Sequence, residues 1–521
     1  MNQGATHEGT VRFAASKQKR ILKGGFRQLG RTGLMTSGLG FGCYRVEDEK
    51  PQHQWAMVSA LKAFCNLIDT STNYTDGSSE ICVGKVLKDL FATGELNRDE
   101  VIVVSKVGYV QGQNLKLVKD CERQSKPFSD VVRYADGCWH CIHPEFLSVQ
   151  LGSSLDRLKL DQIDVYLLHN PEYFLMDYAK QIGSDPKKME KMRAEFYERI
   201  RLAFLRLEEE VSKGRIQCYG VSSNTFVESP DDSGFTSVSQ MWDIAEEVGQ
   251  KLFGKKGAHH FSVIQLPMNL LESGAVLQSN NGAQVKKTAL EFALEVNLGV
   301  LVNRPLNAYA FGHLVRLVDF PVDKELEGSI RDQAKRVSEL EAHFRADLGH
   351  KIFRSASGMQ HDQYFRWGDE IGGADVDSIG MENWRDIEEQ MIKPQLRRLT
   401  AILDQELKGE VAKSWRTWRD RYAPEVERLL TLVRNECAKK SQKMSEALSR
   451  HLNPFLPKEL IKYPLCWKAL GVLLNTDGVG CVLNGMRSEE YVKDAIRTME
   501  LESYRVSNEL YKTFENVFKS E

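Results

Sequence analysis

The chain has 521 residues, which leaves room for one domain of about 250 residues and roughly as much again. Its formal net charge of −2 offers no basic surface for nucleic acid, and no apolar run approaches the roughly 20 residues that span a bilayer. Ten cysteines are scattered along the chain, which indicates reduced thiols in a cytoplasmic protein rather than a disulfide framework. We therefore expect neither nucleic acid nor a membrane as a partner.

Residues 1–24 are polar and carry several basic side chains. They lack the apolar core of a secretory signal, so secretion is not expected. Their basic residues, together with Ser and Ala, leave an organelle transit peptide as an alternative. Glu8 and the weak amphipathicity of the segment favour a disordered tail instead.

From residue 25 to residue 317, short apolar runs alternate with amphipathic stretches. The helix-like segment WAMVSALKAF precedes the run NLIDT, and PEFLSVQLGSSLDRL precedes IDVYLLH. This alternation is typical of a parallel sheet covered by helices. It predicts an α/β fold, and the polar residues at the strand ends favour a (β/α)8 TIM barrel.

Four side chains stand at or just beyond the ends of these apolar runs, namely Asp69, Tyr74, Lys106 and His169. Because the carboxyl ends of barrel strands meet at one mouth, we expect the four to gather there. A tyrosine, whose ordinary pKa is about 10, is a poor acid unless a neighbouring ammonium stabilises its anion. Lys106, held by Asp69, would therefore lower the pKa of Tyr74. Tyr74 could then protonate a carbonyl oxygen as hydride reaches the carbon, with His169 orienting that oxygen.

Residues 111–140 interrupt the alternation with a polar stretch after the Lys106 strand. Since loops that follow barrel strands crowd around the mouth, this stretch is a candidate substrate loop. Cys138, Cys141 and His143 have part of the spacing of a zinc site. No second ligand pair follows them, so free thiols and no metal are expected.

The stretch 318–464 departs most strongly from the barrel pattern. Apolar residues recur at three- and four-residue intervals there, as at Trp415, Trp418 and Tyr422. We predict an all-helical insertion, folded as a compact bundle, after which residues 465–521 complete the barrel. Because it leaves the barrel on the mouth side, we expect it to pack beside or over the active site. Docking on the outer helix ring is the alternative, and a protein partner bound to 318–464 is a further hypothesis.

Several segments, in this order, resemble the aldo-keto reductase family: FRQLGRTGLMTSGLGFGCYRV, IDTSTNYTDGSSEICVGKVL, GRIQCYGVSSNTF, VIQLPMNLLE, LGVLVNRPLNAY and GVGCVLNGMRSEEYVKDA. The resemblance implies an NAD(P)H-dependent oxidoreductase that acts on a small carbonyl or alcohol substrate, including sugars. It implies that Asp69, Tyr74, Lys106 and His169 are the catalytic residues. Some members, such as potassium-channel β subunits, serve a partner protein. A cofactor-binding regulatory or scaffold subunit with little turnover is therefore the alternative function.

The resemblance also implies a set of cofactor-binding residues. They are Gly42, Cys43, Ser223, Asn224, Gln265, Asn303, Arg304, Pro305, Leu306, Gly485, Arg487, Ser488 and Asp494. An extra serine leaves open whether Ser223 or Asn224 holds the nicotinamide carboxamide beside Gln265. Arg304 would meet the pyrophosphate or form a salt bridge at the rim.

Arg487 determines the expected cofactor preference. At the start of a helix it can give a forked contact to a 2′-phosphate, so NADP(H) is favoured over NAD(H). The alternative is that Arg487 and Ser488 only cap a surface helix. Asp494 replaces an asparagine that is common in the family, which would weaken adenine binding.

Overall fold

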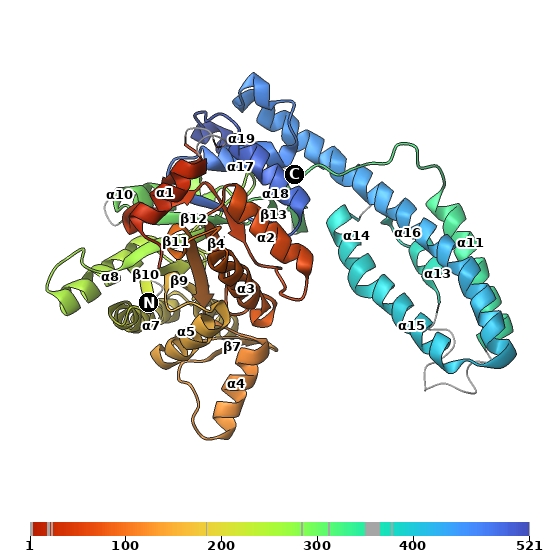
Figure 1. The fold of residues 1–521 in the computed structure, drawn as a ribbon, viewed down its shortest axis with the longest axis horizontal. Helices are drawn as coiled ribbons and strands as arrows, with labels where there is room; N and C mark the ends of the chain where they lie inside the picture. The colour runs from red at the N-terminus through yellow and green to blue at the C-terminus, as the bar shows by residue number, and fades with distance from the viewer. Residues whose placement is uncertain are drawn as a thin grey trace. The chain divides into compact units, whose positions relative to one another are not determined.

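The computed structural model describes residues 4–17, 21, 24–183, 185–282, 285–310, 313–349, 365–376 and 379–519. Two compact units make up the chain (Figure 1). One comprises Met1–His313 and Phe455–Glu521, and the other comprises Leu314–Pro454. The helical unit therefore begins at residue 314 and ends at residue 454, instead of the expected 318 and 464.

Eight parallel strands close into a barrel in which chain order is also spatial order. They are β3 Leu39–Gly42, β4 Leu67–Asp69, β5 Ile102–Val107, β9 Ile163–His169, β10 Ile216–Ser222, β11 Phe261–Pro267, β12 Gly299–Asn303 and β15 Cys481–Asn484. These strands are almost wholly buried, because one face fills the barrel and the other packs under helices. The (β/α)8 barrel predicted from the sequence is confirmed.

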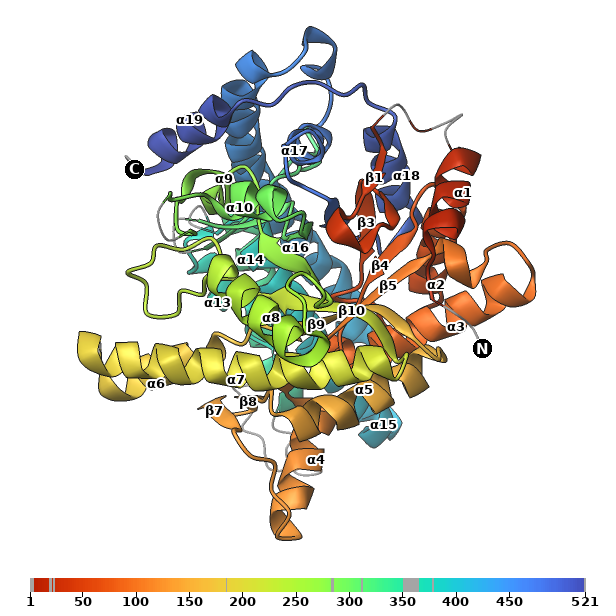
Figure 2. The same cartoon turned by 90° about the vertical axis from the view of Figure 1, so that its left-hand side faces the viewer.

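A helix follows each barrel strand and lies on the outside of the barrel (Figure 2). These helices are α2 Pro51–Ala63, α3 Ser78–Ala92, α5 Pro144–Leu158, α7 Pro186–Ser212, α8 Val238–Phe253, α10 Ala289–Glu295, α17 Leu465–Leu474 and α18 Glu489–Met499. Local sequence explains where several of them begin. Proline occupies the first helical position of α2 and α5, and Thr288 and Glu291 form a capping box at α10.

The barrel unit contains further helices and strands. They are α1 His7–Lys17, β1 Phe26–Gln28, β2 Met35–Ser37, β6 Tyr109–Val110, α4 Gly112–Arg123, β7 Val132–Ala135, β8 Cys138–His140, α6 Tyr173–Ile182, α9 Gly274–Leu277, β13 Asn307–Ala310 and α19 Asn508–Lys519. Strands β6, β8 and β7 form a small antiparallel sheet. The predicted substrate loop 111–140 is therefore folded, with α4 and two of these strands inside it.

The N-terminal segment corrects one expectation. The disordered tail predicted for residues 1–24 is wrong for residues 4–17. The backbone N–H of Ala5 donates to Asp164 Oδ1 at 2.6 Å, and Gln217 Nε2 donates to the Ala5 carbonyl at 2.8 Å. Arg12 on α1 forms an ion pair with Asp99 at 2.8 Å. The partners that order this segment lie far along the chain, so its own weak amphipathicity does not reveal them.

The second unit is built from helices around an aromatic core. Strand β14 His313–Arg316 begins at the last residue of the first unit's long segment and continues into the second. The helices of the second unit are α11 Ile330–His343, α13 Trp367–Gly372, α14 Met381–Ile387, α15 Lys393–Glu406 and α16 Gly409–Leu452, with π-helical turns at Phe344–Gly349 and Glu388–Ile392. Trp415, Trp418 and Tyr422 on α16 are buried, as their spacing predicts. Within the described part of the chain, no helix combines the length and apolar character that crossing a membrane requires.

Candidate active site

The ends of two adjacent strands, β4 and β5, and the turn after β4 bring Lys106 into contact with Asp69 and Tyr74. Lys106 Nζ donates to Asp69 Oδ2 at 2.6 Å, to Tyr74 Oη at 3.0 Å and to the Thr70 carbonyl at 3.0 Å. Three acceptors match the three protons of an ammonium group. The Lys106 side chain has no exposed surface, so this network must hold its charge inside the barrel. Burial lowers the pKa of Lys106, but Asp69 and Tyr74 together raise it above its ordinary value.

His169 lies on the other side of the tyrosine. Its ring meets the Tyr74 ring edge-on, with centroids 5.8 Å apart. Ser71 Oγ lies 3.1 Å from Nδ1 and orients the imidazole. Burial, followed by the charge of Lys106, lowers the pKa of His169 well below its usual value. His169 is therefore neutral at physiological pH and suited to hydrogen bonding with an oxygen beside Tyr74.

The pKa of Tyr74 departs from the sequence expectation. Burial raises the pKa of Tyr74 to about 12, and the charge of Lys106 opposes this rise without overcoming it. The expected lowering is therefore wrong in its net direction. The physical reason is that burial disfavours a phenolate more than Lys106 favours it, and the nearby Asp69 carboxylate disfavours it further. Tyr74 consequently keeps its proton at neutral pH, which is the form that can deliver one.

Gln265 connects this cluster to the ends of the neighbouring strands. Its Nε2 donates to Asp69 Oδ1 at 2.8 Å. Its Oε1 accepts from Ser222 Oγ at 3.2 Å and from Asn303 Nδ2 at 3.3 Å. Asn303 Oδ1 is buried and has no hydrogen-bond partner among the described residues. A ligand amide could satisfy that oxygen.

From the sequence, Ser223 and Asn224 were named at the end of strand β10, and Ser222 was not. In the structure the Ser223 hydroxyl lies 2.9 Å from Thr236 Oγ1, while Ser222 reaches Gln265. The cause is strand alternation, which points successive side chains to opposite faces. Because Ser222 pairs in register with both His169 and Gln265, the strand register identifies it. Asn224 contributes its backbone N–H, which donates to Glu172 at 2.9 Å.

Gly42 is the last residue of the first barrel strand, and Cys43 follows it. A side chain at Gly42 would approach the Asn484 carbonyl to 3.3 Å, so glycine lets β3 lie close to β15. The backbone N–H of Cys43 donates to the Asp69 carbonyl at 2.9 Å. Burial raises the pKa of the Cys43 thiol well above its ordinary value, so this thiol is inert.

The turn after β12 carries Asn303, Arg304, Pro305 and Leu306. Arg304 has a left-handed backbone, with φ 54°, and its guanidinium forms an ion pair with Glu272 at 2.9 Å. Of the two roles left open for Arg304, the structure shows the rim salt bridge. Pro305 is buried and Leu306 half-buried. In this turn, Asn303 is the residue that hydrogen-bonds to Gln265.

Four of the residues predicted to bind the cofactor, namely Gly485, Arg487, Ser488 and Asp494, lie just before α18 or within it. Ser488 is the N-cap of this helix, and its hydroxyl accepts from the Tyr491 N–H at 3.4 Å. Arg487 is half-buried beside it, whereas Gly485 is exposed. Asp494 accepts from Trp467 Nε1 at 3.2 Å, which directs its carboxylate toward α17. Ser488 therefore caps α18, and Arg487 lies just before the N-terminus of this helix.

The two histidines near Cys138 and Cys141 make other contacts. His140 Nε2 lies 2.7 Å from the His169 carbonyl oxygen, and His143 caps α5. Among the described residues, no group of three or more His, Cys, Asp or Glu side chains is arranged to hold a metal ion. His140 instead ties β8 to the backbone of His169.

Glu172 gives a pH-dependent prediction for this site. It is 1% exposed, and burial raises its pKa to about 7 from an ordinary 4.5. The folded protein then binds this proton more tightly than the unfolded chain, so stability is lost as the pH rises from 4.5 to about 7. At about pH 8.5, Glu172→Gln should be more stable than the natural protein by up to about 3 kcal/mol. Near the lower end of the window the two should match.

The check is the midpoint of urea denaturation of both proteins at the two pH values. Glu145→Gln, at an exposed position on α5, controls for the loss of one carboxylate. A stability difference for Glu172→Gln that does not change with pH would contradict the account.

The sequence of this chain matches one known protein family. The sequence model of the aldo/keto reductase family matches residues 38–308, which is more than half of the chain. The chain belongs to the aldo/keto reductase family. The resemblance predicted from the motifs is confirmed, and the family match ends just before the helical unit begins.

Individual relatives match a smaller part of this aldo/keto reductase. It is 30% identical over 142 residues to the NADH-specific methylglyoxal reductase of Escherichia coli (strain K12), covering 27% of this chain and 38% of that protein. It is 28% identical over 151 residues to a candidate voltage-gated potassium channel subunit beta of Schizosaccharomyces pombe, covering 28% and 37%. The chain thus spans less than two fifths of the length of these curated relatives.

Among solved structures, this aldo/keto reductase is similar to one from Bacillus halodurans in its holo form. That likeness has 18% identity and a TM-score of 0.44, and covers 95% of this chain and 97% of the other. A structure from Klebsiella pneumoniae, in complex with NADP and acetate, gives 15% identity, a TM-score of 0.39 and 95% coverage of each chain.

Proposed function

We propose that this aldo/keto reductase is an NADP(H)-dependent oxidoreductase that reduces an aldehyde or ketone, or oxidises the matching alcohol or sugar. One observation carries the proposal. Lys106 Nζ lies 3.0 Å from Tyr74 Oη while it is held at 2.6 Å by Asp69, inside the end of a closed barrel. This is the arrangement needed to move a proton at the tyrosine oxygen. The absence of a disulfide among the ten cysteines fits the cytoplasmic location that we propose with it.

Each side chain has a distinct task in this proposal. Bound NADPH would supply the hydride that reaches the carbonyl carbon. Tyr74 donates its proton to the carbonyl oxygen, and in the oxidation direction it removes that proton. Lys106 stabilises the phenolate that Tyr74 leaves behind, since an ammonium 3.0 Å away favours the anion. Asp69 holds Lys106 in place, and neutral His169 binds the same oxygen and orients it.

The residues around Gln265 fit a nicotinamide carboxamide. Such a group has both donors and an acceptor, and the site offers the same mixture. Asn303 Oδ1, buried and without a partner in the described residues, can accept from its N–H group. Gln265 Nε2, which donates one of its two protons to Asp69, can donate the other to the carboxamide oxygen. The match supports nicotinamide binding at this end of the barrel.

Preference for NADP(H) over NAD(H) is the finer part of the proposal and depends on Arg487. The methylglyoxal reductase relative is named as NADH-specific, so family membership does not decide the preference. Arg487→Ala should weaken NADPH binding about 10- to 100-fold, the effect expected when a charge-assisted contact is lost. NADH binding should change little, because NADH has no 2′-phosphate.

Fluorescence titration of both cofactors measures this ratio. Arg497→Ala is a matched control, since Arg497 lies in the last turn of α18, the helix that Arg487 precedes, and pairs with Glu500 at 3.5 Å. An unchanged ratio of NADPH to NADH affinity in Arg487→Ala would refute the NADP(H) preference.

A second function is favoured by a different observation. One relative is named as a candidate channel β subunit, and this chain carries a separate helical unit with its own core. In this alternative the barrel binds the cofactor with little turnover and the helical unit binds a partner protein. A broad aldehyde, ketone and sugar screen separates the two. Tight NADPH binding with negligible turnover on every compound would favour the regulatory function.

A further inference from the structure

The backbone immediately after Tyr74 is unusual. Thr75 has φ 46° and ψ 41°, Asp76 has φ 54° and ψ 42°, and Gly77 has φ 87°. Three successive residues are therefore left-handed, and two of them carry a side chain. A β-branched threonine is especially disfavoured there, because its Cβ crowds the backbone. Such a turn persists only where surrounding contacts hold it.

Helix α4 supplies contacts that hold this turn. Asp76 Oδ1 accepts from the backbone N–H of Gln113 at 2.8 Å, and Gln113 Nε2 donates to the Asp76 carbonyl at 2.7 Å. Both the side chain and the backbone of Asp76 are thus bound by one residue of α4. On the opposite side, Thr75 Oγ1 donates to the Val46 carbonyl at 2.5 Å.

The start of α4 is shaped to receive this aspartate. Gly112 has φ +50°, and a side chain there would come within 2.1 Å of Asp76 Oδ1. Only glycine therefore allows the two segments to approach this closely. The contact continues on the other side of the tyrosine, where Asn73 Nδ2 donates to Gln111 Oε1 at 3.3 Å. Tyr74 is bracketed in sequence by two residues that both bind the 111–113 segment.

We propose that Asp76 is a positioning residue, which fixes the Tyr74 turn against residues 111–113 at the start of α4. The inference deepens the proposed function and rests on it. Asp76 does not touch the reacting atoms. It acts through the placement of the Tyr74 hydroxyl relative to Lys106, so a displacement of residues 111–113 also displaces the tyrosine.

Substitution of Asp76, which lies on the Tyr74 turn, tests the proposal. In Asp76→Ala, kcat for carbonyl reduction should fall about tenfold, because small displacements of a reacting group are costly. The dissociation constant for NADPH should stay unchanged. Asp76→Asn should retain most activity, since asparagine keeps an acceptor and tolerates the left-handed backbone. Rescue by this conservative variant separates positioning from a general loss of the fold.

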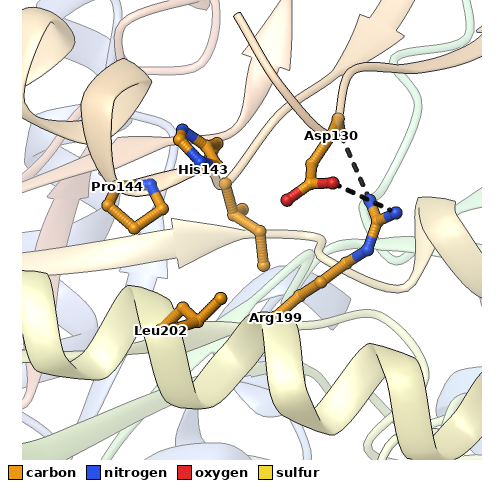
Figure 3. A pocket seen from close by; sticks show the side chains of 6 residues that line it. Asp130, His143, Pro144, Arg199 and Leu202 are labelled. Carbon is orange, nitrogen blue, oxygen red and sulfur yellow. Dashed lines mark hydrogen bonds and ion pairs between the residues drawn. The ribbon is translucent and has the colours of Figure 1, made fainter.

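Substitution of Gly112, which faces Asp76 from α4, is a second test of the proposal. Gly112→Ala should reproduce the loss of kcat, because its methyl group pushes Asp76 away. Gly137→Ala is the matched control, since Gly137 also has positive φ, 69°, but no atom within 4 Å of an added Cβ. Asp130→Ala is a second control in the same segment. Asp130 is also left-handed, with φ 61°, but faces Arg199 on α7 at 3.4 Å (Figure 3).

Hydrogen–deuterium exchange gives a readout that does not need activity. Exchange at residues 73–78 should be faster in Asp76→Ala and Gly112→Ala than in the natural protein and the two controls. Unchanged exchange there, unchanged kcat in Asp76→Ala, or an equal loss of kcat in Asp130→Ala would overturn the proposal. If the natural protein reduces no carbonyl compound, the proposed function fails, while the exchange comparison still decides whether α4 holds the turn.

Discussion

Tyr74→Phe is expected to lower kcat for carbonyl reduction by a factor of roughly 10²–10⁴, the usual contribution of a positioned acid or base. The variant keeps the ring and its edge-on contact with His169, and loses only the hydroxyl 3.0 Å from Lys106. NADPH affinity should therefore be preserved. Steady-state rates with one accepted aldehyde, together with a cofactor titration, measure both quantities.

Tyr44→Phe provides the control for this experiment. The Tyr44 ring lies 5.3 Å from the Tyr74 ring, and the side chain is 65% exposed. It is therefore a second phenol at the same mouth, but without contact to Lys106 in the described structure. Its loss should change kcat by less than about tenfold. Equal losses in the two variants would show that Tyr74 has no special role in proton transfer.

Lys106→Met is expected to have the second-largest effect, on stability as well as on activity. The Asp69 carboxylate would remain buried with Gln265 but without its ammonium partner. Removing one member of a buried ion pair typically costs about 3–5 kcal/mol, because the other charge is left uncompensated. The midpoint of urea denaturation should fall accordingly, and carbonyl reduction should be lost.

The double variant Asp69→Asn with Lys106→Met separates the two effects. Removing both charges should recover most of the stability, since no buried charge is left, but none of the activity. Lys85→Met is the control, because Lys85 pairs with Asp48 at the surface, where solvent screens the pair, so its loss should change the denaturation midpoint far less. A double variant as unstable as Lys106→Met would contradict the argument from the unpaired charge.

The fold and three members of the catalytic group were predictable because local patterns encode them. Asp69, Lys106 and His169 each end or lie near the end of a continuous apolar run, and parallel strands present such ends at a common edge. The helical stripe of Trp415 and Trp418 was also visible, since its spacing matches one helix face.

What could not be predicted depends on partners far apart in sequence. Ser222 contacts Gln265 because of the register between β10 and β11, which no local pattern contains. Residues 4–17 are ordered by Asp164, Gln217 and Asp99 rather than by their own composition. The net pKa of Tyr74 depends on the balance between burial and one shared ammonium, and only the three-dimensional arrangement sets that balance.

Transfer of hydrogen from the cofactor tests the central claim most directly. The protein is incubated with NADPH carrying deuterium at the reactive C4 position and with a panel of aldehydes and ketones, and the products are examined by mass spectrometry. The account predicts an alcohol with one deuterium on the former carbonyl carbon, formed much more slowly by Tyr74→Phe. NADPH binding without deuterium transfer to any carbonyl compound, or an equal rate in Tyr74→Phe, would contradict it.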